Sequence, residues 1–183
     1  MRDLWKNKKY VFAIILILEI AAGILFFLYG YHWLKMIRYL VLVGFLMVLA
    51  FIDYEKTIIP NKILLWMAAI RGVLLLGEIL AFPEFWAEIV KSAVFGLLIG
   101  LSIFLLAYVL SRKSIGLGDV KLAAVLGWYL GGALIWWDIV VCLAFAGIYC
   151  IVQLLRKKLG MKDSIPLAPF FSIGTILVLL IGF

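Results

Sequence analysis

The amino-acid sequence predicts an all-α protein, a polytopic transmembrane bundle of about seven helices forming one domain over residues 1–183. Hydrophobic residues make up 68% of the chain, and its mean hydropathy is +1.23. Soluble domains contain roughly 45–50% apolar residues, so a water-soluble chain of this length could not bury the excess. The apolar residues also fall into runs of about 20, the length that a membrane-spanning helix requires.

Seven apolar runs are long enough to be considered as spanning helices. In chain order they are Val11–Tyr29, Met36–Ile52, Ile63–Phe82, Ile89–Leu110, Val120–Trp137, Ile139–Leu155 and Pro166–Phe183.

Charged residues precede the first span, follow the second and lie within the third. The basic stretch MRDLWKNKKY precedes the first, an order that resembles a signal peptide. Because the run is long and lacks a clear small-residue cleavage site, we expect an uncleaved helix. The second span ends at Asp53. The third contains Arg71 and Glu78, which are seven residues apart and share a face; with Glu19 they form a predicted buried charge cluster.

The later spans contain pairs of small residues. Gly96–Gly100 lies in the fourth span and Gly127–Gly131 in the fifth. Glycines four residues apart allow two membrane helices to pack closely. The fifth span begins beside Asp119, and only Asp138 separates it from the sixth.

Basic residues orient the bundle, because lysine and arginine are enriched in cytoplasmic loops. With the N-terminus inside, the inner segments hold 13 of the 17 basic residues. These are Arg2, Lys6, Lys8, Lys9, Lys56, Lys62, Arg112, Lys113, Lys121, Arg156, Lys157, Lys158 and Lys162. This orientation predicts a C-terminus on the outside and places Asp53 and Asp119 together on the cytoplasmic face.

The composition argues against several other functions. The net charge of +7 does not indicate a nucleic-acid partner, because most of the charges lie in short loops between apolar runs. Cys142 and Cys150 lack metal-ligand spacing, so we expect packing roles. His32 is the only histidine and lies far from both aspartates. We expect neither a metal nor a nucleotide cofactor.

Asp53 and Asp119 are the candidate catalytic residues. Carboxylates at membrane helices are costly and mark functional sites by default. Gly116 and Gly118 leave room for a backbone to approach Asp119. Two nearby carboxylates cannot both ionise easily, so one can deprotonate water while the other, protonated, polarises a carbonyl. The pair therefore supplies the groups of an aspartic protease, and the helix dipole favours Asp119 as the base.

Three motifs in order now support a resemblance to a family. Gly116–Asp119 reads GLGD and resembles the GxGD signature of intramembrane-type aspartyl proteases. Asp53 followed by Ile59-Pro60-Asn61 resembles the first aspartate motif of type IV prepilin peptidases. Ile165–Phe170 reads IPLAPF and resembles that family's C-terminal proline-rich motif.

The resemblance implies an enzyme that cuts basic leaders from type IV prepilins or pseudopilins at the cytoplasmic face of a prokaryotic cell membrane. Besides the bilayer, the precursor would be its partner; oligomeric state stays open. Larger members carry an insertion near the N-terminus, often with paired cysteines, that is associated with N-methylation. Here Tyr29–Met36 is short and no CxxC occurs. The resemblance therefore implies a peptidase-only form. The third motif departs at Leu167-Ala168, where the family usually has an aromatic residue and a glycine.

Other residues near the motifs have a functional and a plainer interpretation. Glu55 would tune the aspartate pair or bind a basic leader, or is a solvated loop charge. Lys121 would stabilise the ionised pair or meet lipid phosphate. Pro60-Asn61 marks the turn into the third span. We expect Pro166 and Pro169 to break and restart the seventh helix, freeing backbone groups to pair with an extended peptide.

Two other functions stay open. One is a GxGD protease of the signal-peptide-peptidase or presenilin type, which usually has Tyr directly before the first aspartate. Here Ile52 precedes Asp53, and the Pro-Ala-Leu motif of that class is absent. The other is a non-enzymatic transporter or assembly protein, which would show inverted repeats and broken helices near the membrane midplane.

Overall fold

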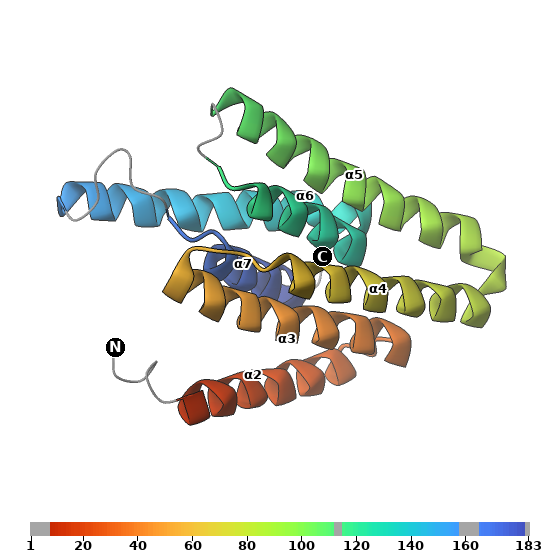
Figure 1. Ribbon diagram of the computed structural model, residues 1–183. Helices are drawn as coiled ribbons and strands as arrows, with labels where there is room; N and C mark the ends of the chain where they lie inside the picture. The colour runs from red at the N-terminus through yellow and green to blue at the C-terminus, as the bar shows by residue number, and fades with distance from the viewer. Residues whose placement is uncertain (1–7, 112–114, 158–164, 182–183) are drawn as a thin grey trace.

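The computed structural model describes residues 8–111, 115–157 and 165–181, and within these ranges the chain is helical without any strand. The α-helices are α2 (Lys8–Leu28), α3 (Trp33–Lys56), α4 (Asn61–Ala81), α5 (Trp86–Leu110), α6 (Leu117–Leu155) and α7 (Ala168–Ile181). A short 3-10 turn, η1 (Pro83–Phe85), joins α4 to α5. The predicted all-α class is therefore confirmed (Figure 1).

Several of these helices are suited to a bilayer. By length and composition, α3, α4, the combined segment Pro83–Leu110 and α6 could each cross a membrane. Their outward faces carry many large apolar side chains that are mostly exposed in the described part of the chain, such as Leu65, Leu80 and Leu106. In water this would be costly, so the chain is a multi-pass membrane protein.

Helix α6 contains a sharp bend at Gly131. This residue has φ 80° and ψ 173°, which divides α6 into two helical segments. The predicted break at Asp138 is wrong: Asp138 is fully buried within the second segment. A charged residue suggested a loop, but the conformation demands a glycine, because φ near +80° is strained for other residues. Counted as two segments, α6 brings the described helices to the expected seven.

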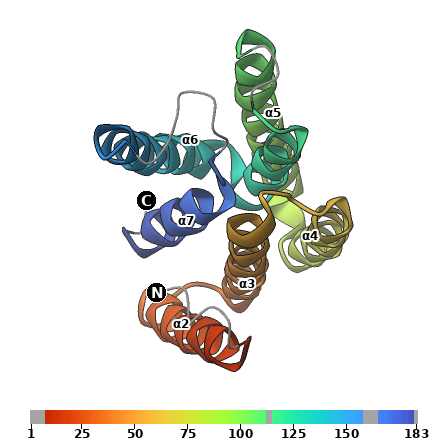
Figure 2. The same cartoon turned by 60° about the vertical axis from the view of Figure 1, so that its left-hand side comes forward.

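The second half of α6 runs back from the bend. Figures 1 and 2 show it as a separate rod, with α7 alongside. It packs on α7 through a hydrogen bond from Thr175 Oγ1 to Asp138 Oδ1 (2.9 Å) and through Cys142 beside Gly174. Cys142 is buried, as its predicted packing role requires.

The first half of α6 lies against α5 with almost no space between the backbones. A Cβ atom on Gly96 would overlap the carbonyl oxygen of Gly127, and one on Gly127 would overlap that of Gly96. Gly100 is similarly pressed against the carbonyl of Ala123. The predicted packing role of these glycines is confirmed.

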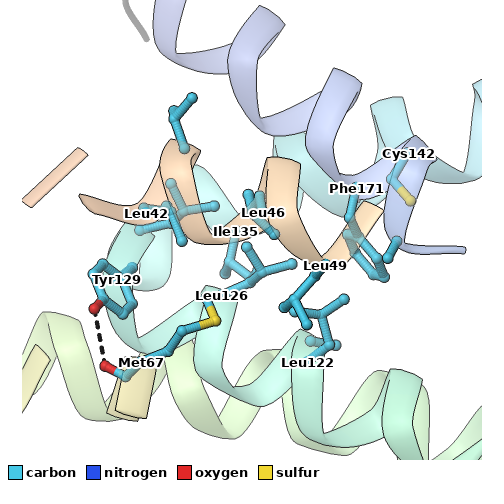
Figure 3. Close-up of a cluster of buried hydrophobic side chains, with 14 of the residues drawn as sticks. Leu42, Leu46, Leu49, Met67, Leu122, Leu126, Tyr129, Ile135, Cys142 and Phe171 are labelled. Carbon is cyan, nitrogen blue, oxygen red and sulfur yellow. Dashed lines mark hydrogen bonds between the residues drawn. The ribbon is translucent and has the colours of Figure 1, made fainter. Parts of the chain in front are cut away.

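Helix α3 occupies the middle of the bundle. Figures 1 and 2 place α2 at one margin and α5 at the opposite one, with α3 between α2 and α4. One face of α3 carries fully buried leucines at 42, 46 and 49, a spacing that aligns side chains along one helix face. Figure 3 shows them facing Leu122, Leu126 and Ile135 of α6.

Buried charges tie α4 to its neighbours. Arg71 Nη2 lies 3.1 Å from Glu78 Oε2, and Arg38 Nη1 of α3 lies 3.0 Å from Glu78 Oε1. The predicted Arg71–Glu78 contact is confirmed. Glu19 is not part of it, because its Oε1 lies against Gly44 of α3.

Some residues used in the sequence analysis lie outside the described ranges. Six of the 13 basic residues that orient the bundle are among them, namely Arg2, Lys6, Arg112, Lys113, Lys158 and Lys162. The same is true of residues 182–183, the end of the seventh predicted span.

The glycine contact predicts the effect of a single methyl group. Gly127→Ala should destabilise the protein by about 1–3 kcal/mol, because overpacking forces the backbones of α5 and α6 apart. Gly147→Ala is the matched control, since a Cβ there meets nothing within 4 Å. Thermal unfolding in detergent compares the two variants. Equal midpoints would show that α5 and α6 do not depend on this contact.

Candidate active site

Asp53 lies on the buried face of α3, near the end of the helix. It follows Leu42, Leu46 and Leu49 at helical spacing, so the leucine row ends in a carboxylate that is only 4% exposed. Asp53 Oδ2 accepts a hydrogen bond from the backbone N–H of Ala168, the first residue of α7, at 3.0 Å. The N–H of Leu167 is a second backbone donor to this carboxylate. The end of α3 is thereby joined to the start of α7.

Asp119 is the third residue of α6. Gly116 forms the helix N-cap and donates its backbone N–H to Asp119 Oδ2 at 3.2 Å. The side chain is half-buried. Leu122 and Leu126 follow it at three and seven residues, so Asp119 begins the apolar row of α6 just as Asp53 ends that of α3.

The register between α3 and α6 brings the two aspartates together. Leu46 faces Leu126, and Leu49 lies beside Leu122 (Figure 3), so the two helices run antiparallel. One further turn in the same register pairs Asp53 with Asp119, and the two carboxylates interact electrostatically. Among the described residues, the ion pairs are those of Glu78; neither aspartate has a cation partner there.

Gly118 lies directly before Asp119, at a position with little room for a side chain. A Cβ atom at this position would lie 3.0 Å from Cβ of Ile59, which is tighter than ordinary contact. The absence of a side chain lets the segment between α3 and α4 rest against the start of α6. The first two motifs therefore meet in space.

A polar contact joins the same two segments. Lys121 Nζ donates to Asn61 Oδ1 at 2.9 Å, although both side chains are exposed. Asn61 is the first residue of α4, and Pro60 is its N-cap, as expected for a turn into that helix. The Lys121–Asn61 contact was not predicted, because the two residues are 60 positions apart and exposed side chains leave no pattern.

The prolines of the third motif have a different local role from the predicted one. Pro166 precedes α7, and Pro169 lies in its first turn, where a missing N–H removes no helical bond. Helix α7 then continues unbroken to Ile181, so the expected break and restart is wrong. The backbone N–H groups at this helix start bind Asp53.

Leu167-Ala168 departs from the family pattern, but the contact between Asp53 and the backbone at the start of α7 is kept. Asp53 is bound by main-chain N–H groups, which any residue except proline supplies. The contact could not be predicted from the sequence, because a backbone donor has no residue signature.

Glu55 is exposed in the last turn of α3, close in sequence to Asp53 but on a different helix face. Within the described ranges, no group of three or more His, Cys, Asp or Glu side chains is arranged to hold a metal ion. The chemistry available at this end is that of two neighbouring carboxyl groups held by backbone donors.

The chain is similar to known bacterial proteins over most of its length. The chain is 25% identical over 149 residues to a prepilin leader peptidase/N-methyltransferase of Bacillus subtilis (strain 168), covering 81% of this chain and 57% of the relative. It is 30% identical over 172 residues to a protein of the same name from Pectobacterium carotovorum subsp. carotovorum, covering 86% and 57%. The chain thus spans less than three fifths of these relatives. No solved structure matches it.

The family comparison covers both aspartates. The model of the type IV leader peptidase family matches residues 40–182, a range that includes all three motifs, most of α3 and the whole of α4 to α7. The chain that brings Asp53 and Asp119 together at one end of its bundle therefore belongs to the type IV leader peptidase family.

Proposed function

We propose that the chain is an aspartic endopeptidase that removes the leader peptide from type IV prepilin-like or pseudopilin precursors, with Asp53 and Asp119 as its catalytic pair. The observation that carries the proposal is the meeting of two carboxylates at the ends of two buried leucine rows, without a cation partner in the described part of the chain. A structural role alone would favour a compensating charge, because uncompensated buried carboxylates are costly. Membership of the type IV leader peptidase family supports this class of substrate.

The proposed mechanism uses the pair as one acid–base unit. The ionised carboxyl takes a proton from a water molecule as the water oxygen attacks the scissile carbonyl carbon. The protonated carboxyl donates a hydrogen bond to the carbonyl oxygen, and a proton is then delivered to the departing amine nitrogen. Backbone N–H groups at Asp53 Oδ2 and Asp119 Oδ2 fix the two carboxyls in place, which reduces the reorganisation needed during reaction.

The surroundings suggest how a precursor would be held. Glu55 is exposed at the aspartate end and could attract a basic leader peptide. The Lys121–Asn61 contact fixes the segment between α3 and α4 beside Asp119. We infer that the leader approaches over this segment, while the apolar part of the precursor remains in the bilayer.

A helix-capping role is the competing interpretation of both aspartates. Each accepts a backbone N–H at the start of a helix, Asp53 at α7 and Asp119 at α6. Such caps contribute about 1 kcal/mol. Replacement by asparagine separates the two roles, because an amide oxygen still accepts the hydrogen bond but the ionisable proton is lost.

Asp53→Asn and Asp119→Asn should each reduce cleavage by about 10²–10⁴-fold or more, because each removes one half of the acid–base unit. The double variant should be no worse than either single one, since members of a catalytic unit are not additive. Cleavage of one prepilin, measured by mobility shift and N-terminal sequencing at matched membrane abundance, provides the test.

Glu55→Gln is the matched control for the aspartate variants, since it removes a carboxylate two residues from Asp53 on an exposed face. It should retain substantial activity if Glu55 only aids leader binding. Robust cleavage by either aspartate variant would rule out the aspartic mechanism and leave the capping interpretation.

We propose that the aspartate end faces the cytoplasm, in a prokaryotic cell membrane, because the basic residues favour that side. The loop containing Ile58 lies at the aspartate end, and η1 lies at the opposite end. In a Cys142→Ala, Cys150→Ala background, an impermeant maleimide should label Glu84→Cys on intact cells. Ile58→Cys should be labelled only after permeabilisation. The reverse pattern would invert the proposed orientation.

We further propose that the chain cleaves without methylating the new N-terminus. Only Tyr29–His32 separates α2 from α3, and the sequence has no CxxC or glycine-rich nucleotide motif. A pilin processed by the purified protein with S-adenosylmethionine present should therefore carry a free N-terminal amine in mass spectra. A mass increase of one methyl group that requires the protein would contradict this.

A further inference from the structure

A cavity with several charged side chains in its lining lies at the end of the bundle opposite the aspartates. It has a volume of about 390 Å³ and is lined by residues of α3, α4, α5 and α6 together with η1 and the segment before α3. Arg38 on its wall precedes Asp53 by 15 residues, or about 22 Å of helix at 1.5 Å per residue. The cavity is therefore separate from the candidate active site.

The floor of the cavity is buried and its rim is open. Arg71 is 1% exposed and Tyr129 is fully buried, whereas Phe82, Phe85 and Glu88 at the rim are exposed. The cavity thus opens at the end of the bundle, and Arg71 is part of its buried lining.

Arg71 is held rigidly from two sides. Its Nε donates to the carbonyl oxygen of Trp128 at 3.1 Å, and its Nη2 donates to Glu78 Oε2 at 3.1 Å. Glu78 Oε1 in turn accepts from Arg38 Nη1 at 3.0 Å. Both carboxylate oxygens of Glu78 are therefore engaged, and the two guanidinium groups are fixed by the same residue.

Two donors of this network remain unused. Arg71 Nη1 and Arg38 Nε are buried and have no hydrogen-bond partner among the described residues. A buried donor of a charged group that lacks a partner is more costly than a neutral one. Such groups in a native structure call for a ligand, an ion or a water molecule.

The charge of the cavity indicates the sign of that ligand. Three cations line it, Lys35, Arg38 and Arg71, against two carboxylates, Glu78 and Glu88. Glu78 is occupied by both arginines, and Glu88 lies at the exposed rim. The interior therefore presents an excess of positive charge with unused N–H donors.

We propose that this cavity binds a phosphate group, with Arg71 and Arg38 as its ligands. A planar guanidinium matches the oxygens of a phosphate, and the rim of the cavity opens at an end of the bundle. The phosphate belongs either to a phospholipid headgroup entering at the end of the bundle or to a free phosphate ion. The proposal does not depend on peptidase activity, because its residues lie at the other end.

Two probes distinguish the sources. Short-chain phosphatidylglycerol is added to the detergent-purified full chain and its binding is measured by native mass spectrometry. Inorganic phosphate is tested separately by thermal unfolding, against chloride at equal ionic strength. Lipid binding without a phosphate effect identifies a headgroup site, and a phosphate effect without lipid binding identifies a free-ion site. A wild-type protein that responds to neither probe overturns the proposal.

The decisive variant is the double change Arg71→Gln/Glu78→Gln. It removes the guanidinium with the unused donor but leaves the net charge of the cavity unchanged, because one cation and one anion are lost together. Affinity for the responding probe should fall by about tenfold, as expected when a charged hydrogen bond worth about 1.4 kcal/mol is lost. Lys91→Gln is the control: it removes an exposed cation of α5 outside the cavity and should change affinity less than twofold.

Further variants keep the test independent of folding and of catalysis. If the double variant does not fold, Arg38→Gln at the half-buried wall replaces it, with the same expected loss. Asp53→Asn should bind the probe like wild type, which separates this site from the peptidase site. Wild-type affinity in the folded double variant, or an equal loss in Lys91→Gln, would overturn the proposal.

Discussion

The antiparallel contact between the leucine row of α3 and the apolar row of α6 is the interaction on which the candidate site depends. Each row is a run of buried side chains at helical spacing, and Asp53 and Asp119 lie next to the two rows at the same end of the bundle. The leucines stabilise the contact through close van der Waals packing against the facing helix, because removal from water drives no association between helices inside a bilayer. This packing holds Asp53 and Asp119 close together without a cation from the described residues. The pair of carboxyl groups is thus held by the core beneath it.

The rest of the bundle supports this contact from both sides. On one side, Gly96, Gly100 and Gly127 let α5 and α6 approach to backbone contact, which fixes the first half of α6. On the other, the bend at Gly131 sends the second half of α6 back alongside α7, where Asp138 and Thr175 are hydrogen-bonded. Helix α7 then begins beside Asp53 and donates the N–H of Ala168 to it. A single glycine with positive φ therefore determines where the third motif lies.

The charged groups are arranged differently at the two ends of the molecule. At the aspartate end, two like charges lie together, an arrangement suited to sharing a proton. At the other end, Glu78 is bound by two arginines that together retain unused donors. The first arrangement favours proton transfer and the second favours anion binding. Both groups of charged residues lie among helices that are otherwise almost wholly apolar. The low dielectric constant of these surroundings strengthens the electrostatic interactions within each group.

The sequence by itself determined the all-α class, most of the helices and the residues of the candidate site. Apolar runs of about 20 residues have one stable form in a bilayer, because each backbone group must be hydrogen-bonded within its own helix. Glycines four residues apart and charges seven residues apart lie on one face of a helix, so their contacts could be predicted from helical periodicity. This explains the confirmed roles of Gly96, Gly127, Arg71 and Glu78. Tertiary structure decided what periodicity does not encode. The bend fell at Gly131 and not at Asp138, because a reversal of the chain needs positive φ and a buried aspartate needs only a partner such as Thr175. The contacts of Asp53 with the Ala168 N–H and of Lys121 with Asn61 join residues 115 and 60 positions apart, and such distances in sequence are bridged only when the helices pack.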